Sequence, residues 1–275
     1  MRADAICYPI AFEGVLTRVF EAGRGQKSLL FIHGLGARAD RWRHNLGAVA
    51  DAGRRAIALD LPGHGFAAKD ATFPHGMPAY ADFVRAAIRG LELDRPVLVG
   101  TSLGGHIAAA VACAAPDLVS GLVLIGSTGL FPIGDEARER LASRAVDRSI
   151  PGIESKAKTV FFDPSLASER FITEEHRVNN SPGADAVFNV LAEYFRRRLD
   201  ADAVGERLAQ MKPRPPIQLV WGAQDRSVPL AIGQAAARLL APAPLAVIEN
   251  AAHAPYFEKP GEFNPVLLKF LRELD

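Results

Sequence analysis

The sequence predicts an α/β fold, a mostly parallel, doubly wound sheet with a helical lid inserted between two of its strands. Three observations lead to this prediction. Short apolar runs alternate with longer segments of helical pattern, as they do in sheets covered by helices on both faces. The segment 129–212 interrupts this rhythm. The length of 275 residues suits one large α/β domain.

Six apolar runs are predicted to be buried parallel strands. Each run is continuously apolar rather than alternating, which is typical of strands covered on both faces. The predicted strands span 28–32, 55–60, 96–101, 122–126, 216–221 and 245–249. Residues 14–20 and the segment before them would add an antiparallel hairpin at one edge of the sheet.

Helices are predicted between the strands, because apolar residues recur there at helical spacing. They are expected at 41–52, 78–91, 103–115, 230–240 and 261–274, with further helical patterns at 136–146 and 184–199. We predict that residues 1–128 and 213–275 form the α/β core and that residues 129–212 form a helical lid or cap over the site. The alternative is a surface layer of helices with no role in binding.

Composition limits the class of partner. The chain has 32 Lys and Arg against 31 Asp and Glu, so it lacks the basic excess that phosphate contacts give nucleic-acid-binding proteins. No apolar stretch reaches the ~18 residues of a membrane span, and the first residues lack the apolar core of a signal peptide. We expect a small-molecule substrate, no nucleic acid or membrane partner, and a cytoplasmic location. A homodimer stays open.

The candidate nucleophile lies in Gly100-Thr101-Ser102-Leu103-Gly104, which fits the pattern G-x-S-x-G. The motif follows an apolar strand and opens a helix, as a strand–turn–helix elbow requires. Such an elbow lifts the Ser102 hydroxyl above the sheet. It also leaves backbone N–H groups free at the start of the helix, where negative charge is favoured.

Four further motifs fall at turns after predicted strands. They are HGLG at 33–36, DLPGHG at 60–65, WGAQDRSVP at 221–229 and AHAPYFEKP at 252–260. As a set, and in this order, they resemble those of the α/β-hydrolase family over residues 29–274, apart from the helical insertion. The resemblance implies the α/β-hydrolase fold, an oxyanion loop at 33–36, and turns that carry the acid and the histidine of a catalytic triad.

The triad implied by these motifs is Ser102, Asp225 and His253. A serine hydroxyl needs a base that takes its proton, and a pKa near neutrality favours histidine for that role. An acid then holds the imidazole in one tautomer. The chain order Ser…Asp…His is the order of this fold. The turn at 126–129, where some relatives carry the acid, reads GSTG and has no carboxylate.

A serine nucleophile points to acyl transfer, because relatives that open epoxides or displace halides use Asp. The backbone N–H groups of Leu35 and Leu103 are the expected oxyanion donors. We expect hydrolysis of a small carboxylic ester, with lactonase, amidase or peptidase activity as alternatives. A receptor without catalysis stays open, since fold does not fix function.

A narrower resemblance concerns the predicted lid. The segments FDPS at 162–165 and FITEEHR at 171–177 are similar to the lid of meta-cleavage-product hydrolases. Those enzymes split a C–C bond in a dienoic keto acid with the same triad, and the resemblance implies that Arg177 binds the substrate carboxylate. Those relatives usually carry Trp directly after the histidine, whereas this chain has Ala254. C–C hydrolysis is therefore the alternative to ester hydrolysis.

The inserted segment also holds the residues expected to contact the substrate. Some aromatic residues of the insertion should line an apolar pocket, and Phe131, Phe162 and Tyr194 are the candidates, although they could instead form the lid's own core. Arginines gather at 138–148 and 196–198. We interpret most of them as solvated, but an anionic substrate would have to rely on one of them. No dinucleotide, P-loop or metal-ligand pattern is present, so we expect no cofactor and no metal.

Overall fold

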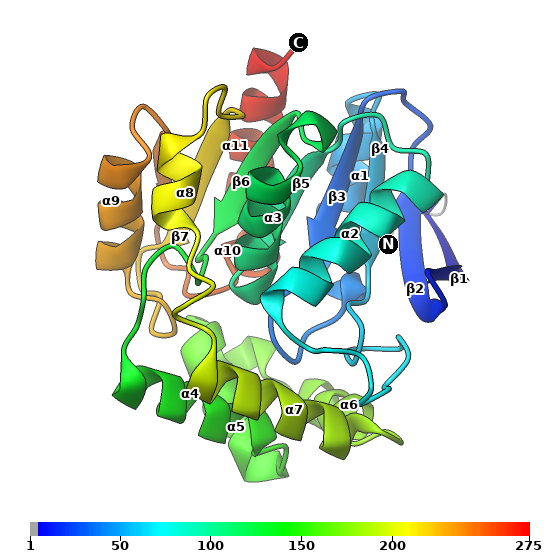
Figure 1. Cartoon of the computed structure of the whole chain (residues 1–275), viewed down its shortest axis with the longest axis vertical. Coiled ribbons are helices and arrows are strands. Elements are labelled where there is room, and N and C mark those ends of the chain that lie inside the picture. Colours follow the sequence, from blue (N-terminus) through cyan, green and yellow to red (C-terminus); the bar gives the residue numbers. More distant parts are fainter. Residues whose placement is uncertain (1–4) are drawn as a thin grey trace.

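An eight-stranded sheet forms the centre of the computed structural model, which describes residues 5–275 (Figure 1). The strand order is β1-β2-β4-β3-β5-β6-β7-β8. The strands are β1 (Ile6–Phe12), β2 (Val15–Ala22), β3 (Ser28–Ile32), β4 (Arg55–Leu59), β5 (Val97–Thr101), β6 (Gly121–Ile125), β7 (Ile217–Gly222) and β8 (Leu245–Ile248). All pairs from β4 to β8 are parallel, and β2 is antiparallel to β1 and β4. The predicted α/β sheet is confirmed.

The six predicted parallel strands match the observed ones to within one residue at each end. The predicted edge hairpin is also present, with Phe12 paired to Val15. Its two turn residues, Glu13 and Gly14, have φ angles of 47° and 83°. Positive φ at both positions matches the right-handed twist of the two strands that the turn joins.

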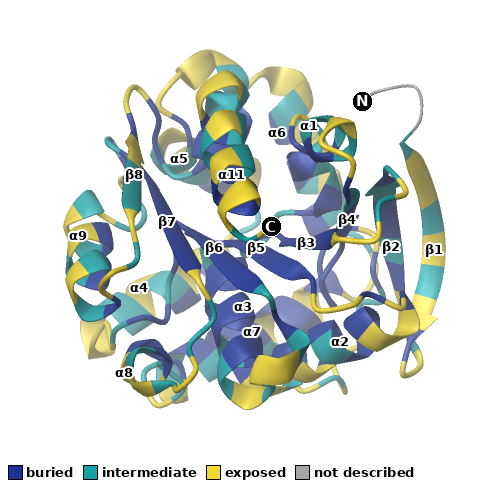
Figure 2. Cartoon of the chain, turned by 90° about the horizontal axis from the view of Figure 1, so that it is seen from above, coloured by how far each residue is buried: buried dark blue, intermediate teal, exposed yellow. Residues whose placement is uncertain are grey.

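The sheet separates two hydrophobic cores. Successive side chains of a strand point to opposite faces. On β3, Leu30 and Ile32 belong to one core, whereas Leu29 and Phe31 belong to the other. All residues of β3 are buried, as are those of β5, β6 and β7. Figure 2 shows these dark strands between layers of helices with yellow outer surfaces. Burial on both faces explains the continuous apolar runs in the sequence.

Helices cover both faces of the sheet. The core with Leu30 contains residues of α2 (Met77–Gly90), α3 (Leu103–Ala114), α8 (Gly205–Gln210) and α9 (Leu230–Leu239). The other core contains residues of α1 (Leu46–Asp51), α10 (Pro255–Glu258) and α11 (Pro260–Glu273). The prediction of one helix at 41–52 was wrong, because a 3-10 turn at Ala39–Trp42 precedes α1. Between them, the buried Asn45 amide donates to the Tyr256 carbonyl.

Four helices lie together at one end of the sheet, below it in Figure 1. They are α4 (Asp135–Val146), α5 (Ile150–Val160), α6 (Glu169–Asn179) and α7 (Ala184–Arg197). Ser149 and Ser168 cap α5 and α6 by accepting from the backbone N–H groups of Gly152 and Phe171. The next helix, α8, instead contacts α3 and α9. The division into core and lid stays a prediction.

Within residues 5–275, no helix combines the length and the apolar character that a membrane crossing requires.

Candidate active site

Ser102 lies in a sharp turn between β5 and α3, with φ 54° and ψ −119°. Positive φ is rare for a residue with a side chain and is found where the surrounding structure enforces it. The flanking glycines allow the turn. A Cβ on Gly100 would lie 2.2 Å from the Gly104 carbonyl oxygen, and a Cβ on Gly104 would lie 2.2 Å from that of Ile32. The G-x-S-x-G pattern therefore reflects close backbone approach at both glycines.

His253 and Asp225 meet beyond the ends of β8 and β7. The Nδ1 of His253 lies 2.8 Å from Oδ2 of Asp225, whose side chain is fully buried. The other oxygen, Oδ1, accepts from the backbone N–H groups of Ser227 and Val228, each over 2.8 Å. These bonds fix the carboxylate, so that Nδ1–H of His253 donates to it and Nε2 is left as the basic nitrogen.

Buried histidines among the described residues include His33, His64 and His106, which make other contacts. The Nε2 of His33 accepts from the backbone N–H of Leu61 over 2.9 Å, and burial lowers its pKa to about 4. Burial likewise lowers the pKa of His64 to about 3. The ring of His106 contacts the carbonyl oxygen of Asp202 at 2.8 Å. The two neutral rings and His106 therefore brace turns and loops.

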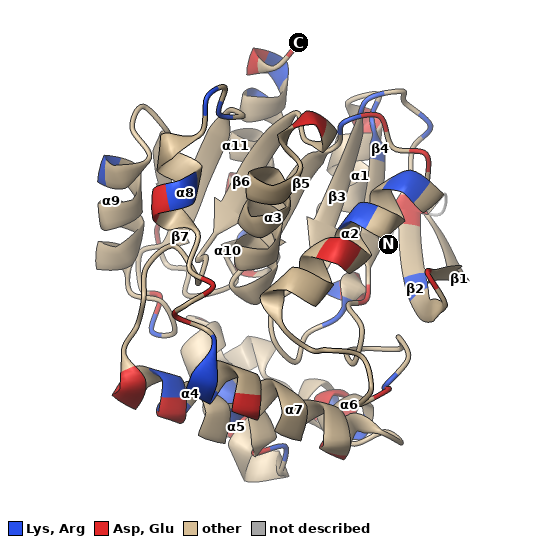
Figure 3. Cartoon of the chain, viewed as in Figure 1, with Lys and Arg blue, Asp and Glu red and all other residues tan. Residues whose placement is uncertain are grey.

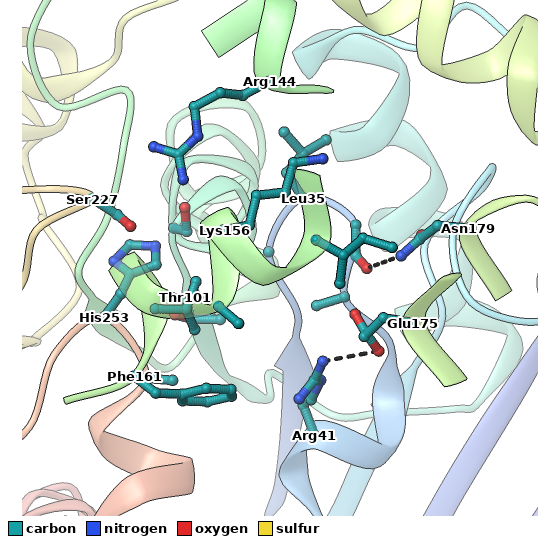
Figure 4. A pocket seen from close by; sticks show the side chains of 18 of the residues that line it. Leu35, Arg41, Thr101, Arg144, Lys156, Phe161, Glu175, Asn179, Ser227 and His253 are labelled. Atoms are coloured by element: carbon teal, nitrogen blue, oxygen red, sulfur yellow. Dashed lines mark hydrogen bonds and ion pairs between the residues drawn. The ribbon is translucent and has the colours of Figure 1, made fainter. Parts of the chain in front are cut away.

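Ser102 and His253 line one cavity of about 230 Å³. Leu35 and Gly36, from the loop after β3, line the same cavity. Helices α4–α7 supply much of the remaining wall (Figure 4). Apolar side chains there are Leu141, Ala145, Ile153, Ala157, Val160, Phe161, Phe171 and Phe188. Charged side chains in the lining are Arg41, Arg144, Arg148, Lys156 and Glu175.

The loop after β3 is tied to α6. Asn179 donates from Nδ2 to the Gly36 carbonyl over 3.1 Å. Arg41, which follows the same loop, contacts Glu175 in the cavity wall, as Figure 4 shows. A Cβ on Gly34, the residue before Leu35, would lie 3.2 Å from Cβ of Ser102, and Leu103 is the first residue of α3. Both predicted oxyanion donors thus belong to segments that adjoin Ser102. The N–H of Leu103 has no partner within α3, because the first N–H groups of a helix have none.

Residues 29–266 match the model of the alpha/beta hydrolase family. The chain belongs to the α/β-hydrolase family. The expected α/β-hydrolase fold is confirmed. The expectation that the chain is a hydrolase is also confirmed, because its relatives include enzymes named as hydrolases.

Curated relatives of this α/β hydrolase carry several names. It is 31% identical over 261 residues to the dihydrolipoyllysine-residue acetyltransferase component of the acetoin cleaving system of Pseudomonas putida, covering 94% of this chain and 68% of the relative. It is 28% identical to the 2-hydroxymuconate semialdehyde hydrolase of Pseudomonas sp. strain CF600, covering 95% and 92%. It is 29% identical to a 2-hydroxy-6-oxononadienedioate/2-hydroxy-6-oxononatrienedioate hydrolase of Burkholderia vietnamiensis, covering 92% and 89%.

Solved structures of similar hydrolases superpose over nearly the whole chain. A meta-cleavage product hydrolase from Pseudomonas fluorescens IP01 matches with a TM-score of 0.87 and 25% identity, covering 98% of both chains. A membrane phospholipase A matches with a TM-score of 0.83 and 25% identity, covering 99% of this chain and 87% of that one.

The four residues predicted to line the substrate pocket lie elsewhere. Phe131 packs against the core that contains Leu30. Tyr194 donates from its hydroxyl to Oδ2 of Asp202 over 2.5 Å. Phe162 is 38% exposed, whereas its neighbour Phe161 is buried and lines the cavity. The chain is extended at Phe161, and neighbouring side chains of an extended chain point to opposite sides.

Arg177, predicted to bind a substrate carboxylate, also lies outside the cavity that Ser102 and His253 line. It lines a separate surface groove with Phe66, Lys69 and Arg170. Helix geometry gives the reason. Glu175 and Asn179 are four residues apart on α6 and share the face that lines the cavity. Arg177, two residues from each, falls on the opposite side of the helix.

Residues in and near α4 and α5 line the cavity, and of these the sequence had pointed only to the arginines, as possible partners of an anionic substrate. They are Leu141, Arg144, Ala145 and Arg148 around α4, and Ile153, Lys156, Ala157 and Val160 on α5. Both sets follow the spacing i, i+3, i+4, i+7, which marks one face of a helix. A basic residue inside such an apolar stripe is the signal that could have found them. Among residues 5–275, no group of three or more His, Cys, Asp or Glu side chains could hold a metal ion.

Proposed function

We propose that Ser102 is the nucleophile of this hydrolase, that His253 is its general base and acid, and that Asp225 orients His253. One observation carries the proposal. His253 contacts the buried Asp225 carboxylate at 2.8 Å and lines the same cavity as Ser102, which lies in a turn with positive φ. A nucleophile, a base and an orienting acid in this arrangement are the requirements of acyl transfer by serine.

In the proposed reaction, Ser102 Oγ attacks the substrate carbonyl while Nε2 of His253 accepts its proton. The backbone N–H groups of Leu35 and Leu103 stabilise the negative charge on the carbonyl oxygen. The bond to the leaving group then breaks, and the proton held by His253 passes to that group. Water, deprotonated by His253, hydrolyses the acyl-enzyme and restores Ser102.

We further propose that the leaving group is carbon, in a small dienoic keto acid. Two relatives at 28% and 29% identity, which align over most of this chain, are named as hydrolases of such compounds. The 2-hydroxydienoate first tautomerises to its 2-keto form, which moves the enol proton to C5. The electron pair of the breaking C5–C6 bond is then delocalised onto the C2 carbonyl as a dienolate, and the proton held by His253 is transferred to it. The cationic side chains in the cavity suit the negative charge of this substrate.

Hydrolysis of a carboxylic ester is the second candidate. The cavity walls are mostly apolar, which suits an acyl chain, and one structure of 25% identity is named a phospholipase A. Ala254 follows His253 where meta-cleavage-product hydrolases usually carry Trp.

The two candidates are tested with two substrates. Turnover of 2-hydroxy-6-oxohexa-2,4-dienoate is followed by its loss of absorbance, and turnover of p-nitrophenyl butyrate by release of nitrophenol. Higher kcat/KM for the dienoate supports C–C hydrolysis. Ester turnover without dienoate turnover contradicts it.

The role of Ser102 is tested with Ser102→Ala, and the exposed Ser143→Ala is the matched control. Loss of turnover in Ser102→Ala alone is expected. Equal rates in Ser102→Ala and the wild type would contradict the serine mechanism for either substrate.

A further inference from the structure

Three cationic side chains from α4 and α5 gather in the wall of the cavity. Arg144 belongs to α4, Arg148 follows that helix, and Lys156 belongs to α5. Figure 3 shows charged residues concentrated on these helices, whereas the strands β5 and β6 carry none. The acidic residue in the same lining, Glu175, is already engaged by Arg38 and Arg41. The cavity wall therefore has an excess of positive charge.

The contacts of these cations leave capacity for an anion. Arg144 donates from Nη2 to the Thr159 hydroxyl over 2.8 Å. Lys156 donates to a backbone carbonyl, that of Asp147. Neither bond neutralises the charge of its donor, and among the residues that the structure describes no ion pair involves Arg144 or Lys156.

Arg148 provides an independent sign of a ligand. Its Nη2 donates to Asp185 over 2.5 Å, but that carboxylate is 81% exposed and so is screened by water. Its Nη1 is buried and has no hydrogen-bond partner within residues 5–275. A buried guanidinium nitrogen without an acceptor is costly, and a ligand oxygen in the cavity would satisfy it.

The surroundings of Lys156 also favour an anion. The pKa of Lys156 is lowered to about 8, chiefly by burial and further by Arg144 and Arg148, whereas Asp147 and Glu175 act in the opposite direction. Positive charges that destabilise one another are stabilised when an anion is bound between them.

The location connects this cluster with the proposed catalytic residues. Thr159 accepts from Arg144 and lies 3.3 Å from the Ser227 hydroxyl, and Ser227 in turn donates its backbone N–H to Asp225. Figure 4 shows Arg144 extending toward Ser227 and His253. A group held by the cluster would thus lie near the side of the cavity formed by the acid and histidine turns.

We propose that Arg144, Arg148 and Lys156 bind a carboxylate of the substrate and set a preference for acids over neutral compounds of the same shape. This inference rests on the proposed function and takes it further, because it names the residues that select the substrate class. These side chains, rather than Arg177 of α6, hold the anion and position the carbonyl above Ser102.

The test measures binding without catalysis, in Ser102→Ala protein. Dissociation constants of sorbate (hexa-2,4-dienoate) and its neutral amide are measured by calorimetry. The ratio of the two constants gives the preference for the acid. In Lys156→Met and Arg148→Met this preference should fall about tenfold or more, as for the loss of a hydrogen bond between charged groups. Arg144→Met should lower the preference as well. Because Arg144 is exposed, this substitution should leave the stability of the fold unchanged.

Matched controls remove positive charge elsewhere. The first control is Arg140→Met, because Arg140 lies on α4 with a side chain that is 62% exposed and pairs with Glu136. The second is Arg177→Met, because Arg177 lines the separate groove. Both should retain the wild-type preference. The proposal is overturned if Ser102→Ala protein does not prefer sorbate to the amide, or if the controls reduce the preference as much as Lys156→Met does. Because catalysis is not measured, failure of the serine mechanism would be seen separately, in the turnover assays.

Discussion

The guanidinium of Arg41 donates to the carboxylate of Glu175 over 2.9 Å, and both side chains are 9% exposed. Arg38 binds the same carboxylate, and the Arg41 guanidinium lies 4.2 Å from the centre of the Phe171 ring. The contact joins the segment after β3 to α6. It therefore links the loop that carries Leu35 to a helix in the wall of the cavity.

Glu175→Gln should destabilise the fold. The substitution leaves the buried Arg41 with a neutral partner, whereas Arg38 keeps Asp40 and Glu174. Breaking a buried ion pair costs about 3 kcal/mol or more. The free energy of unfolding, measured by urea denaturation, should fall by about that amount. Glu174→Gln removes the same charge at a residue whose side chain is 48% exposed and which pairs with Arg38 alone, so its cost should stay below about 1 kcal/mol. Equal losses in the two variants would show that burial of the pair is unimportant.

Gly104→Ala should be strongly destabilising. Its Cβ would lie 2.2 Å from the Ile32 carbonyl oxygen and 2.6 Å from that of His33, so β3 and α3 would have to separate. A cost of about 1–3 kcal/mol is typical of such overpacking, and turnover should fall because Ser102 is displaced. Gly261→Ala, in α11, meets no atom within 4 Å and should stabilise the helix by about 0.5–1 kcal/mol. Thermal denaturation of both variants distinguishes a clash from a general effect of replacing glycine.

Asp225→Asn should lower kcat by about 10⁴-fold while leaving the fold intact. The amide can still accept from Ser227 and Val228 through its oxygen. Its NH₂ group would then face Nδ1 of His253, which favours the tautomer that carries a proton on Nε2, so that His253 cannot accept the Ser102 proton. Steady-state kinetics gives the change in kcat, and circular dichroism checks the fold. A decrease below about tenfold would contradict the role of Asp225 in orienting the base.

The fold and the proposed triad were accessible from the sequence for a physical reason. Strands buried on both faces are continuously apolar, and the turns after them need Gly100 and Gly104 for close backbone approach, so both leave local patterns. The cavity wall depends on which face of each helix turns inward. Glu175 rather than Arg177 lines the cavity because of the rotation of α6 about its axis, and Phe161 rather than Phe162 lines it because side chains alternate where the chain is extended after α5. Tertiary packing sets these orientations, and composition of the segment alone does not reveal them.

The pH dependence of anion binding provides a last prediction, because the pKa of Lys156 is lowered to about 8 from the ordinary 10.5, chiefly by burial. Its positive charge is present below that pH and is lost as the pH rises through it. The affinity for sorbate should therefore decline between about pH 7 and pH 9. The unfolded chain keeps this proton up to the ordinary pKa of 10.5, so the free energy of unfolding contributed by Lys156 should rise from about pH 8 to about pH 10.5. Calorimetry and urea denaturation at several pH values measure the two trends.

Lys156→Arg is the matched variant for this trend, because a guanidinium keeps its charge throughout the interval. Any decline in sorbate affinity that remains in Lys156→Arg would therefore come from another group in the cavity. The neutral amide of sorbate corrects for changes that do not depend on ligand charge. Identical pH profiles for the wild type and Lys156→Arg would show that Lys156 takes no part in binding the carboxylate, whereas a profile that flattens only in Lys156→Arg assigns the titrating charge to that residue.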